Sequence, residues 1–253
     1  MNNLINDKVN FFSYLRPKKN SSKPFIITSP HSGVLLNKNL LNKRNKNIYD
    51  YDSMQDMYVN SFSEGLEKLG FTVFQSHISR IVIDLNREIT EIDPKTIVGF
   101  PANNMINLSD KVKSGIGLIP MKNSSGRNIY TTKLDWQEVL QRIDNYYLPW
   151  HNNLRLEIDD FTKRYGRVFV IDMHSMPSET NNNELADFVI GNNFDRASDN
   201  HSKKLLSNTI KSYGYSVAHN NPYSGGFITR NYSSLKNNIP VSYTHLRAHE
   251  TIA

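Results

Sequence analysis

Two histidines follow two strongly apolar segments of this 253-residue chain. Residues 168–171 are β-prone and apolar and lead into Asp172 and His174, and residues 24–28 lead in the same way to His31. Short apolar runs of this kind predict buried strands, and open α/β sheets place their chemistry at the carboxyl ends of such strands. Two imidazoles delivered from distant parts of the chain favour a shared metal site over two separate loop-capping histidines.

The absence of cysteine restricts what this metal site can be, because it excludes thiolate–zinc centres, disulfides and a cysteine nucleophile. A zinc ion would need imidazole and carboxylate ligands with an open position for water. Spacing leaves the carboxylate open. Asp56 also fits a helix-capping box, Asp50 and Asp52 are close competitors, and Asp172 could either bind the ion or orient His174 from the same strand face.

Residues 80–87 form a second polar group within an apolar segment. Period-2 alternation places Arg80, Asp84 and Asn86 on one face of a predicted strand. Burying arginine and aspartate is costly unless they are paired or functional, so an Arg80–Asp84 ion pair and a ligand contact are both open interpretations. Asn86 and Arg87 lie at the predicted strand end and are better candidates for binding a carboxylate, which suits a guanidinium fork.

The rest of the chain predicts one α/β domain without repeats or internal linkers. Its helices are expected over residues 53–69, 134–165 with a kink at Pro149, and 199–213, and its further strands over 71–74, 80–83, 187–191 and 215–218. This alternation predicts a three-layer α/β/α fold with a mostly parallel or mixed central sheet. The glycine-rich segments 114–117 and 225–226 favour tight turns over phosphate-binding loops.

Charge and hydropathy restrict the partners. The formal charge is +6, and much of the excess lies in Lys18-Lys19 and residues 38–46. We interpret this as a solvated face, because no aromatic pattern of a nucleic-acid module accompanies it. No secretory signal and no membrane-spanning segment is visible, so a cytoplasmic location is expected.

Residues 241–253 differ in style from the Asn- and Lys-rich chain before them. They resemble a translated sequencing-adapter peptide and are therefore expected to be a non-native tail. The catalytic domain is accordingly expected to cover residues 1–240, with its natural C-terminal part missing.

The motifs, taken in order, resemble those of the N-formylglutamate amidohydrolase family. The resemblance covers residues 23–232 and is specific as an ordered set, although each piece alone is not. It runs through residues 29–33, 56–59, 80–87, 115–120, 149–151, 172–177, 187–191 and 221–226.

This resemblance implies a zinc-carboxypeptidase-like α/β/α fold and a role in histidine catabolism. The implied activity is zinc-dependent hydrolysis of N-formyl-L-glutamate, or a related N-acyl amino acid, to the carboxylate and the free amino acid by metal-activated water. His31 and His174 would be zinc ligands, with Asp56 as the third. The implied partner is a small-molecule substrate rather than a nucleic acid or a membrane, and the oligomeric state is not indicated.

The resemblance also assigns the substrate's carboxylate to Asn86 and Arg87, with Arg80 nearby. In the family, a strand after the Gly-Gly turn carries a glutamate that serves as general base, and here the suspected tail begins where that strand is expected. We expect the match of Glu250 to be a coincidence, because residues 246–249 look too polar for a buried strand. The printed chain is expected to bind zinc with little turnover. The alternative is an inactive homologue or fragment that binds zinc and an amino-acid-like ligand.

Overall fold

The computed structural model describes residues 11–18, 21–46, 54–180, 183–237 and 239–247. The chain forms two compact units, each assembled from separate stretches. Unit 1 comprises Met1–Ser13, Pro30–Gln55 and Ser76–Asn153, and unit 2 comprises Tyr14–Ser29, Asp56–Gln75 and Leu154–Ala253. The expectation of one catalytic domain over residues 1–240 stays a prediction. Within the described ranges, no helix combines the length and apolar character needed to cross a membrane.

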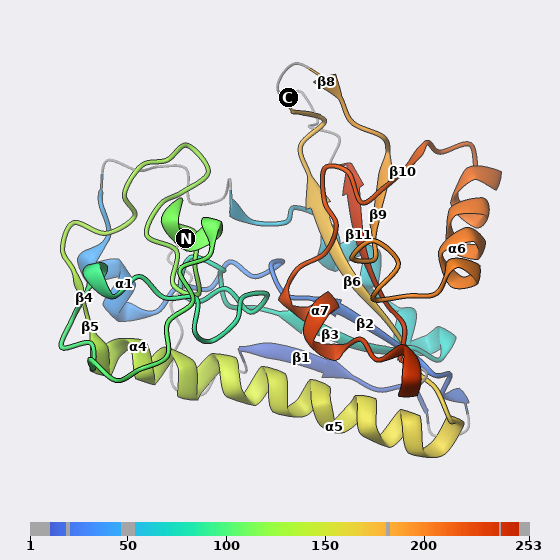
Figure 1. Cartoon of the computed structure of the whole chain (residues 1–253). Coiled ribbons are helices and arrows are strands. Elements are labelled where there is room, and N and C mark those ends of the chain that lie inside the picture. Colours follow the sequence, from blue (N-terminus) through green and yellow to red (C-terminus); the bar gives the residue numbers. More distant parts are fainter. Residues whose placement is uncertain (1–10, 19–20, 47–53, 181–182, 238, 248–253) are drawn as a thin grey trace. The chain divides into compact units, whose positions relative to one another are not determined.

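A seven-stranded mixed sheet, lying mainly in unit 2, organises the fold (Figure 1). Its spatial order is β1 (Phe12–Leu15), β3 (Thr72–Ser76), β2 (Phe25–Ser29), β6 (Phe169–Met176), β11 (Val241–Arg247), β9 (Phe188–Gly191) and β10 (Val217–His219). The pairs β3–β2, β2–β6, β6–β11 and β9–β10 are parallel, whereas β11–β9 is antiparallel. The prediction of an α/β fold with a mostly parallel or mixed central sheet is confirmed.

The pairing of β2 with β6 explains how the sheet positions polar groups. Ile26 and Val170 are register partners in the core, and both are buried. Two residues further along each strand, Thr28 lies beside Asp172. The apolar start of each strand thus anchors a buried polar pair near its carboxyl end, as in other open α/β sheets.

The helices are shorter and more broken than the sequence pattern indicates. They are α1 (Lys38–Lys43), α2 (Val59–Ser63), α3 (Asp110–Lys113), α4 (Trp136–Arg142), α5 (Leu148–Tyr165), α6 (Asn200–Ser212) and α7 (Phe227–Tyr232). The minor elements are the 3-10 turns η3 (Leu66–Leu69), η4 (Pro94–Thr96) and η6 (Leu235–Asn237), the π-helix η5 (Ile143–Tyr147) and the strand pairs β4–β5 (Ile97–Val98, Leu134–Asp135) and β7–β8 (Glu179–Thr180, Asn183–Glu184).

Two of the predicted helices are confirmed. The helix over 199–213 is α6, which begins after Asp199, whose side chain accepts a hydrogen bond from the Ser202 amide at 2.8 Å. The long segment predicted over 134–165 is helical from residue 136 onward, with π-helix η5 between α4 and α5. Pro149 is the second residue of α5, and its missing amide and its clash with the preceding turn are consistent with the π-helix that ends at Tyr147.

Two other predictions are wrong. Residues 53–69 do not form one helix, because Gly65 adopts φ +79° between α2 and η3. The side chains of Tyr58 and Phe62 are solvent-exposed, at 49% and 59%, instead of packing against a core. Residues 80–82 form a turn and residue 83 has no regular structure, so this segment is not a strand. The amide of Asp84 donates to Leu118 O at 2.8 Å, so this segment pairs with a distant loop instead of a sheet.

Candidate functional site

Strand β6 carries the first polar cluster, which lies in unit 2. Asp172 and His174 are two residues apart on the buried face, and their exposed fractions are 0% and 1%. This confirms the prediction that they share one strand face. Both residues lie within β6 rather than beyond its end, because the strand continues to Met176.

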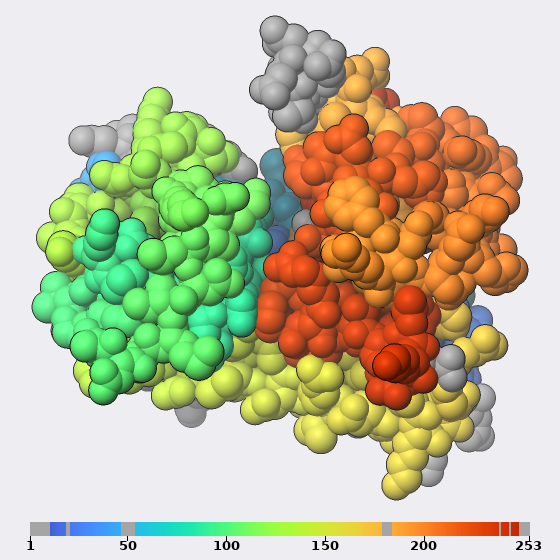
Figure 2. All heavy atoms as spheres, viewed as in Figure 1, coloured from blue at the N-terminus to red at the C-terminus, as the bar shows by residue number. Residues whose placement is uncertain are grey.

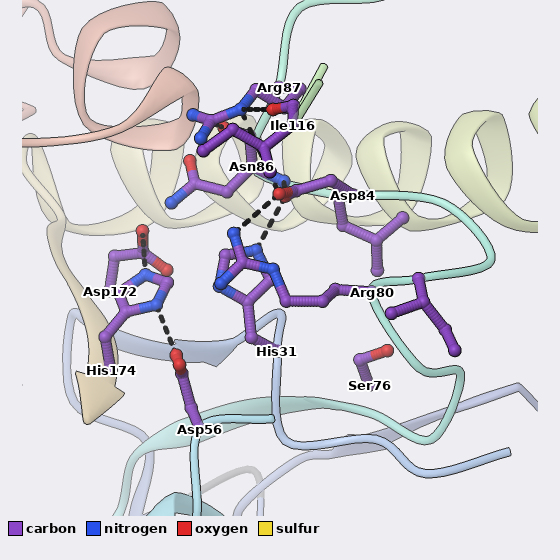
Figure 3. Close-up of polar contacts among 12 residues, drawn as sticks. His31, Asp56, Ser76, Arg80, Asp84, Asn86, Arg87, Ile116, Asp172 and His174 are labelled. Atoms are coloured by element: carbon purple, nitrogen blue, oxygen red, sulfur yellow. Dashed lines mark hydrogen bonds and ion pairs between the residues drawn. The ribbon is translucent and has the colours of Figure 1, made fainter. Parts of the chain in front are cut away.

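The two ring nitrogens of His174 face two different carboxylates (Figure 3). Nδ1 lies 2.6 Å from Asp56 Oδ2, and Nε2 lies 2.9 Å from Asp172 Oδ2. The other oxygen of Asp172 accepts a hydrogen bond from the Thr28 hydroxyl at 2.6 Å. Both carboxylate oxygens of Asp172 are thus engaged, one by Thr28 and one by His174. A carboxylate fixed in this way orients the imidazole that it contacts.

The charge state of His174 follows from these neighbours. Burial alone would lower its pKa, but the carboxylates of Asp172 and Asp56 raise it to about 9. In the metal-free protein this imidazole therefore holds a proton at neutral pH. A metal ion that bound here would have to displace that proton.

Asp84 organises the second polar cluster, which lies in unit 1 (Figure 3). Its side chain is 1% exposed and lies 2.6 Å from His31 Nε2 and 2.7 Å from Arg80 Nη2. The amide of Asn86 also donates to it at 2.8 Å. Burial would raise the pKa of Asp84, but Arg80 and His31 hold it well below its usual range.

The arginines of this cluster differ in their partners. Arg80 forms the ion pair with Asp84, which was one of the two open interpretations. The Nε of Arg87 donates to Ile116 O at 3.0 Å and lies 4.0 Å from Asp84. In the described part of the chain, Arg87 Nη2 makes no hydrogen bond, so it remains able to bind an anion. The substrate roles of Arg80, Asn86 and Arg87 stay predictions.

The structure also shows functional candidates that the sequence reading missed. Tyr223 follows the β10 strand in a turn, and its ring stacks on His245 with centroids 4.0 Å apart. The ring of His245 in turn stacks on His174 at 5.2 Å. Tyr223 lies within the 221–226 motif of the family resemblance, but neither that motif nor its turn pattern assigned a role to this side chain.

Strand β11 corrects part of the reading of the C-terminal residues. Leu246 and Arg247 belong to β11, so they are not too polar for a strand at this position. The strand lies between β6 and β9, with His245 in register with His174. Where the family resemblance expects a glutamate-bearing strand, β11 therefore presents a histidine. Whether residues 241–253 are a non-native tail stays a prediction.

Several candidate residues have defined outcomes. His31, Asp56 and His174 are buried and form, among the described residues, a group that could hold a metal ion. Asp50, Asp52 and Glu250 lie outside the described residues, as does the start of the predicted capping box. Asp56 itself precedes α2, and the residue that caps this helix is Tyr58, without a side-chain hydrogen bond.

Comparisons with known proteins agree with the family resemblance of the sequence motifs. The family described as N-formylglutamate amidohydrolase matches residues 23–247. The chain is 26% identical to the N-formylglutamate deformylase of Pseudomonas putida over 83% of this chain and 74% of that protein. It is 25% identical to the N-formylglutamate deformylase of Pseudomonas aeruginosa over 85% of this chain and 76% of that protein.

The solved structures agree in fold. The crystal structure of N-formylglutamate amidohydrolase from Ralstonia eutropha JMP134 is similar with a TM-score of 0.86 and 26% identity, covering 93% of this chain and 85% of that one. A protein from Agrobacterium tumefaciens shares the fold, with a TM-score of 0.63, 17% identity and coverage of 93% of this chain and 84% of that one. Together with the match over residues 23–247, this shows that the chain belongs to the N-formylglutamate amidohydrolase family.

Proposed function

We propose that this chain is a zinc-dependent amidohydrolase that cleaves N-formyl-L-glutamate, or a related N-acyl amino acid, to a carboxylate and a free amino acid. The observation that carries the proposal is the hydrogen bonding of two histidines. His31 and His174 each direct Nε2 to a buried carboxylate, Asp84 at 2.6 Å and Asp172 at 2.9 Å. Metal-ligating histidines are typically held in this way.

The donor set fits zinc. With Nε2 engaged, Nδ1 is the proposed ligand atom of both histidines, and Asp56 Oδ2, which lies 2.6 Å from His174 Nδ1, supplies the carboxylate. Two imidazoles and one carboxylate are a common zinc set in catalytic sites without thiolates. When bound, zinc lowers the pKa of a bound water towards about 7 and polarises a carbonyl oxygen.

The substrate's carboxylate is proposed to bind Arg87 and Asn86. Arg87 is 12% exposed and its Nε donates to Ile116 O, which leaves its Nη2 to form a charged hydrogen bond with the substrate's carboxylate. Asp84 touches His31 directly and orders Asn86 through its amide. One buried carboxylate thereby couples a proposed metal ligand to the proposed carboxylate-binding groups, which would fix the scissile bond relative to the metal.

A second function is favoured by one observation. His245, and not a glutamate, lies beside His174 on β11. A chain without the expected general base would bind zinc and an amino-acid-like ligand with little or no turnover, because general-base catalysis contributes about 10²–10⁴-fold.

Metal binding is tested first. Purified protein is loaded with zinc, dialysed and analysed for metal. We expect one zinc per chain, and loss of this zinc in His174→Ala, because zinc affinity depends on ligand number and geometry. His201→Ala is the matched control, since His201 is exposed on α6. Less than stoichiometric zinc in the wild-type protein would contradict the proposal.

Activity is tested on the same samples with N-formyl-L-glutamate. Release of formate and glutamate supports the amidohydrolase, whereas calorimetric binding without release supports the second function. Arg87→Ala is expected to keep its zinc and to weaken binding of the substrate, because a charged hydrogen bond contributes about 1.5–3 kcal/mol. If zinc is bound but no N-acyl amino acid binds, both functions are contradicted.

A further inference from the structure

Residues 81–87 include the proposed carboxylate-binding groups Asn86 and Arg87, yet they contain no helix or strand. Buried backbone carbonyls need hydrogen-bond donors, and a segment outside a helix or sheet must find them elsewhere. Here four carbonyls accept hydrogen bonds from side chains of unit 1: Ile81 O from Tyr130 at 3.1 Å, Val82 O from Arg142 at 2.9 Å, Leu85 O from His151 at 3.0 Å and Arg87 O from Tyr147 at 2.9 Å.

Three of these four donors lie on the continuous helical stretch of α4, η5 and α5. Hydrogen bonds of a π-helix span five residues, as from the Leu148 amide to Ile143 O in η5. This spacing turns Arg142 and Tyr147, which are five residues apart, towards the same side of the helix, whereas an α-helix would not align them. His151 follows Tyr147 by four residues, and the centroids of the two rings lie 4.1 Å apart.

Tyr147 and His151 are buried polar residues on a helix face that is otherwise apolar. Leu154 and Ile158 continue this face at steps of three and four residues, and both are fully buried. Because a carbonyl oxygen only accepts, the Nε2 of His151 must donate to Leu85 O. Packing alone would be served by apolar side chains at both positions, so the hydrogen bonds are what tyrosine and histidine add.

The two carbonyls bound by this pair, Leu85 O and Arg87 O, flank Asn86. The side chain of Arg87 has a further contact, because its Nε donates to Ile116 O at 3.0 Å. Ile116 belongs to residues 100–130, which are drawn in green and form a large part of the visible surface of unit 1 (Figure 2). Surface loops are more mobile than packed helices, so the firmer support of this segment comes from the helical side.

We propose that Tyr147 and His151 are positioning residues that hold Asn86 and Arg87 in the geometry that binds the substrate's carboxylate. The inference rests on the proposed function and adds to it the groups that determine this geometry. Both side chains act through backbone carbonyls rather than by touching the substrate. Such support matters because a displacement of about 1 Å in a binding group can lower the reaction rate roughly 10²-fold.

A double-mutant cycle on zinc-loaded protein separates positioning from ordinary structural support. Zinc content is measured together with the affinity for N-formyl-L-glutamate, taken as KM where the ligand is turned over and as a calorimetric Kd otherwise. Tyr147→Phe is expected to weaken this affinity about three- to tenfold at unchanged zinc content, which is the effect of one hydrogen bond. In Arg87→Ala protein the same substitution should change the affinity less than about twofold, because the guanidinium that Tyr147 positions is already absent.

His151 provides a second comparison. His151→Leu removes the donor and should weaken affinity as Tyr147→Phe does, whereas His151→Gln retains an amide donor and should keep most of the affinity. Tyr165→Phe is the matched control, because it removes a hydrogen bond of the same kind elsewhere on α5, from the tyrosine hydroxyl to Ser22 O at 3.0 Å. We expect this control to leave the affinity unchanged.

The outcomes separate this inference from the proposed function. Unchanged affinity in both Tyr147→Phe and His151→Leu overturns the positioning role and leaves the proposed function intact. An equal loss with and without Arg87, or an equal loss in Tyr165→Phe, also overturns it, because the hydrogen bond would then contribute only to general stability. Wild-type protein that binds zinc but no N-acyl amino acid contradicts the proposed function itself.

Discussion

Asp84→Asn is the most informative single substitution, because Asp84 contacts the proposed metal ligand His31 as well as Arg80 and the Asn86 amide. The substitution removes the negative charge that faces Arg80 at 2.7 Å and His31 at 2.6 Å while keeping the shape of the side chain. Breaking a buried ion pair by neutralising one partner costs about 3–5 kcal/mol, since the other charge stays buried. Arg80 is 20% exposed, so we expect the lower end of that range, about 3 kcal/mol.

The assay is urea unfolding of metal-free protein at pH 7. Asp110→Asn is the matched control, because it removes an aspartate from an exposed lysine pair, and we expect it to leave the free energy of unfolding unchanged. In zinc-loaded protein, Asp84→Asn should also weaken metal binding about 10–100-fold, because the partner that orients His31 is altered. A loss of stability below about 1 kcal/mol would refute the view of Asp84 as the organising charge.

The pH dependence of this difference checks its electrostatic origin. The folded-state pKa of Asp84 is held well below its usual value, so its stabilising contribution is complete above pH about 4 and declines as the pH falls further. The wild type should therefore exceed Asp84→Asn by a constant amount between pH 5 and 7, and the difference should shrink in more acidic solution. A difference that grows on acidification would contradict this assignment.

Three further outcomes are expected. Asp172→Asn should lower the pKa of His174 from about 9, and NMR titration of metal-free protein measures this change. The raised pKa stabilises the folded protein fully below pH about 6.5, and this stabilisation is lost as the pH rises towards about 9. The variant should therefore lose less stability than the wild type over that pH interval. Arg142→Met should cost about 3 kcal/mol in urea unfolding, because this buried guanidinium donates to Val82 O at 2.9 Å and pairs with a buried glutamate. Deleting residues 241–253 should abolish cooperative thermal unfolding, since it leaves β6 and β9 without their shared partner strand.

The parts of the fold that could be predicted from the sequence are those with a local cause. The runs at 24–28 and 168–171 became β2 and β6 because buried parallel strands need nothing beyond continuous apolar, β-prone residues. Helix α6 carries both an amphipathic pattern and the Asp199 cap, so its start was predicted to within a residue. The shared strand face of Asp172 and His174 followed from the two-residue period, whereas the period left open whether Asp172 binds a metal ion or pairs with His174.

The parts that could not be predicted depend on long-range contacts. Residues 80–87 alternate like a strand, yet the structure holds them through distant partners. The Asp84 amide donates to Leu118 O, the Arg87 side chain donates to Ile116 O, and the Arg142 side chain donates to Val82 O. None of these contacts is visible in the local pattern. The site residues were therefore easiest to predict where they lie on a strand. They were hardest to predict where a loop brings together residues that are distant in the sequence.

Strand β11 has a structural role, which its backbone fulfils, and a possible chemical role, which depends on the side chain at position 245. Its pairing with β6 and β9 satisfies two strand edges through main-chain hydrogen bonds, which any β-compatible sequence provides. The side chain at position 245 is a different matter, because it is buried and its ring lies 5.2 Å from that of His174. His245→Glu places a carboxylate at this position, where it can take a proton from water. If a missing base limits hydrolysis, the variant should release formate about 10²-fold faster than the wild type with unchanged zinc content, as expected for general-base catalysis. The same exchange at exposed His201 should change neither quantity, and an equal rate in His245→Glu and the wild type would show that position 245 does not limit the reaction.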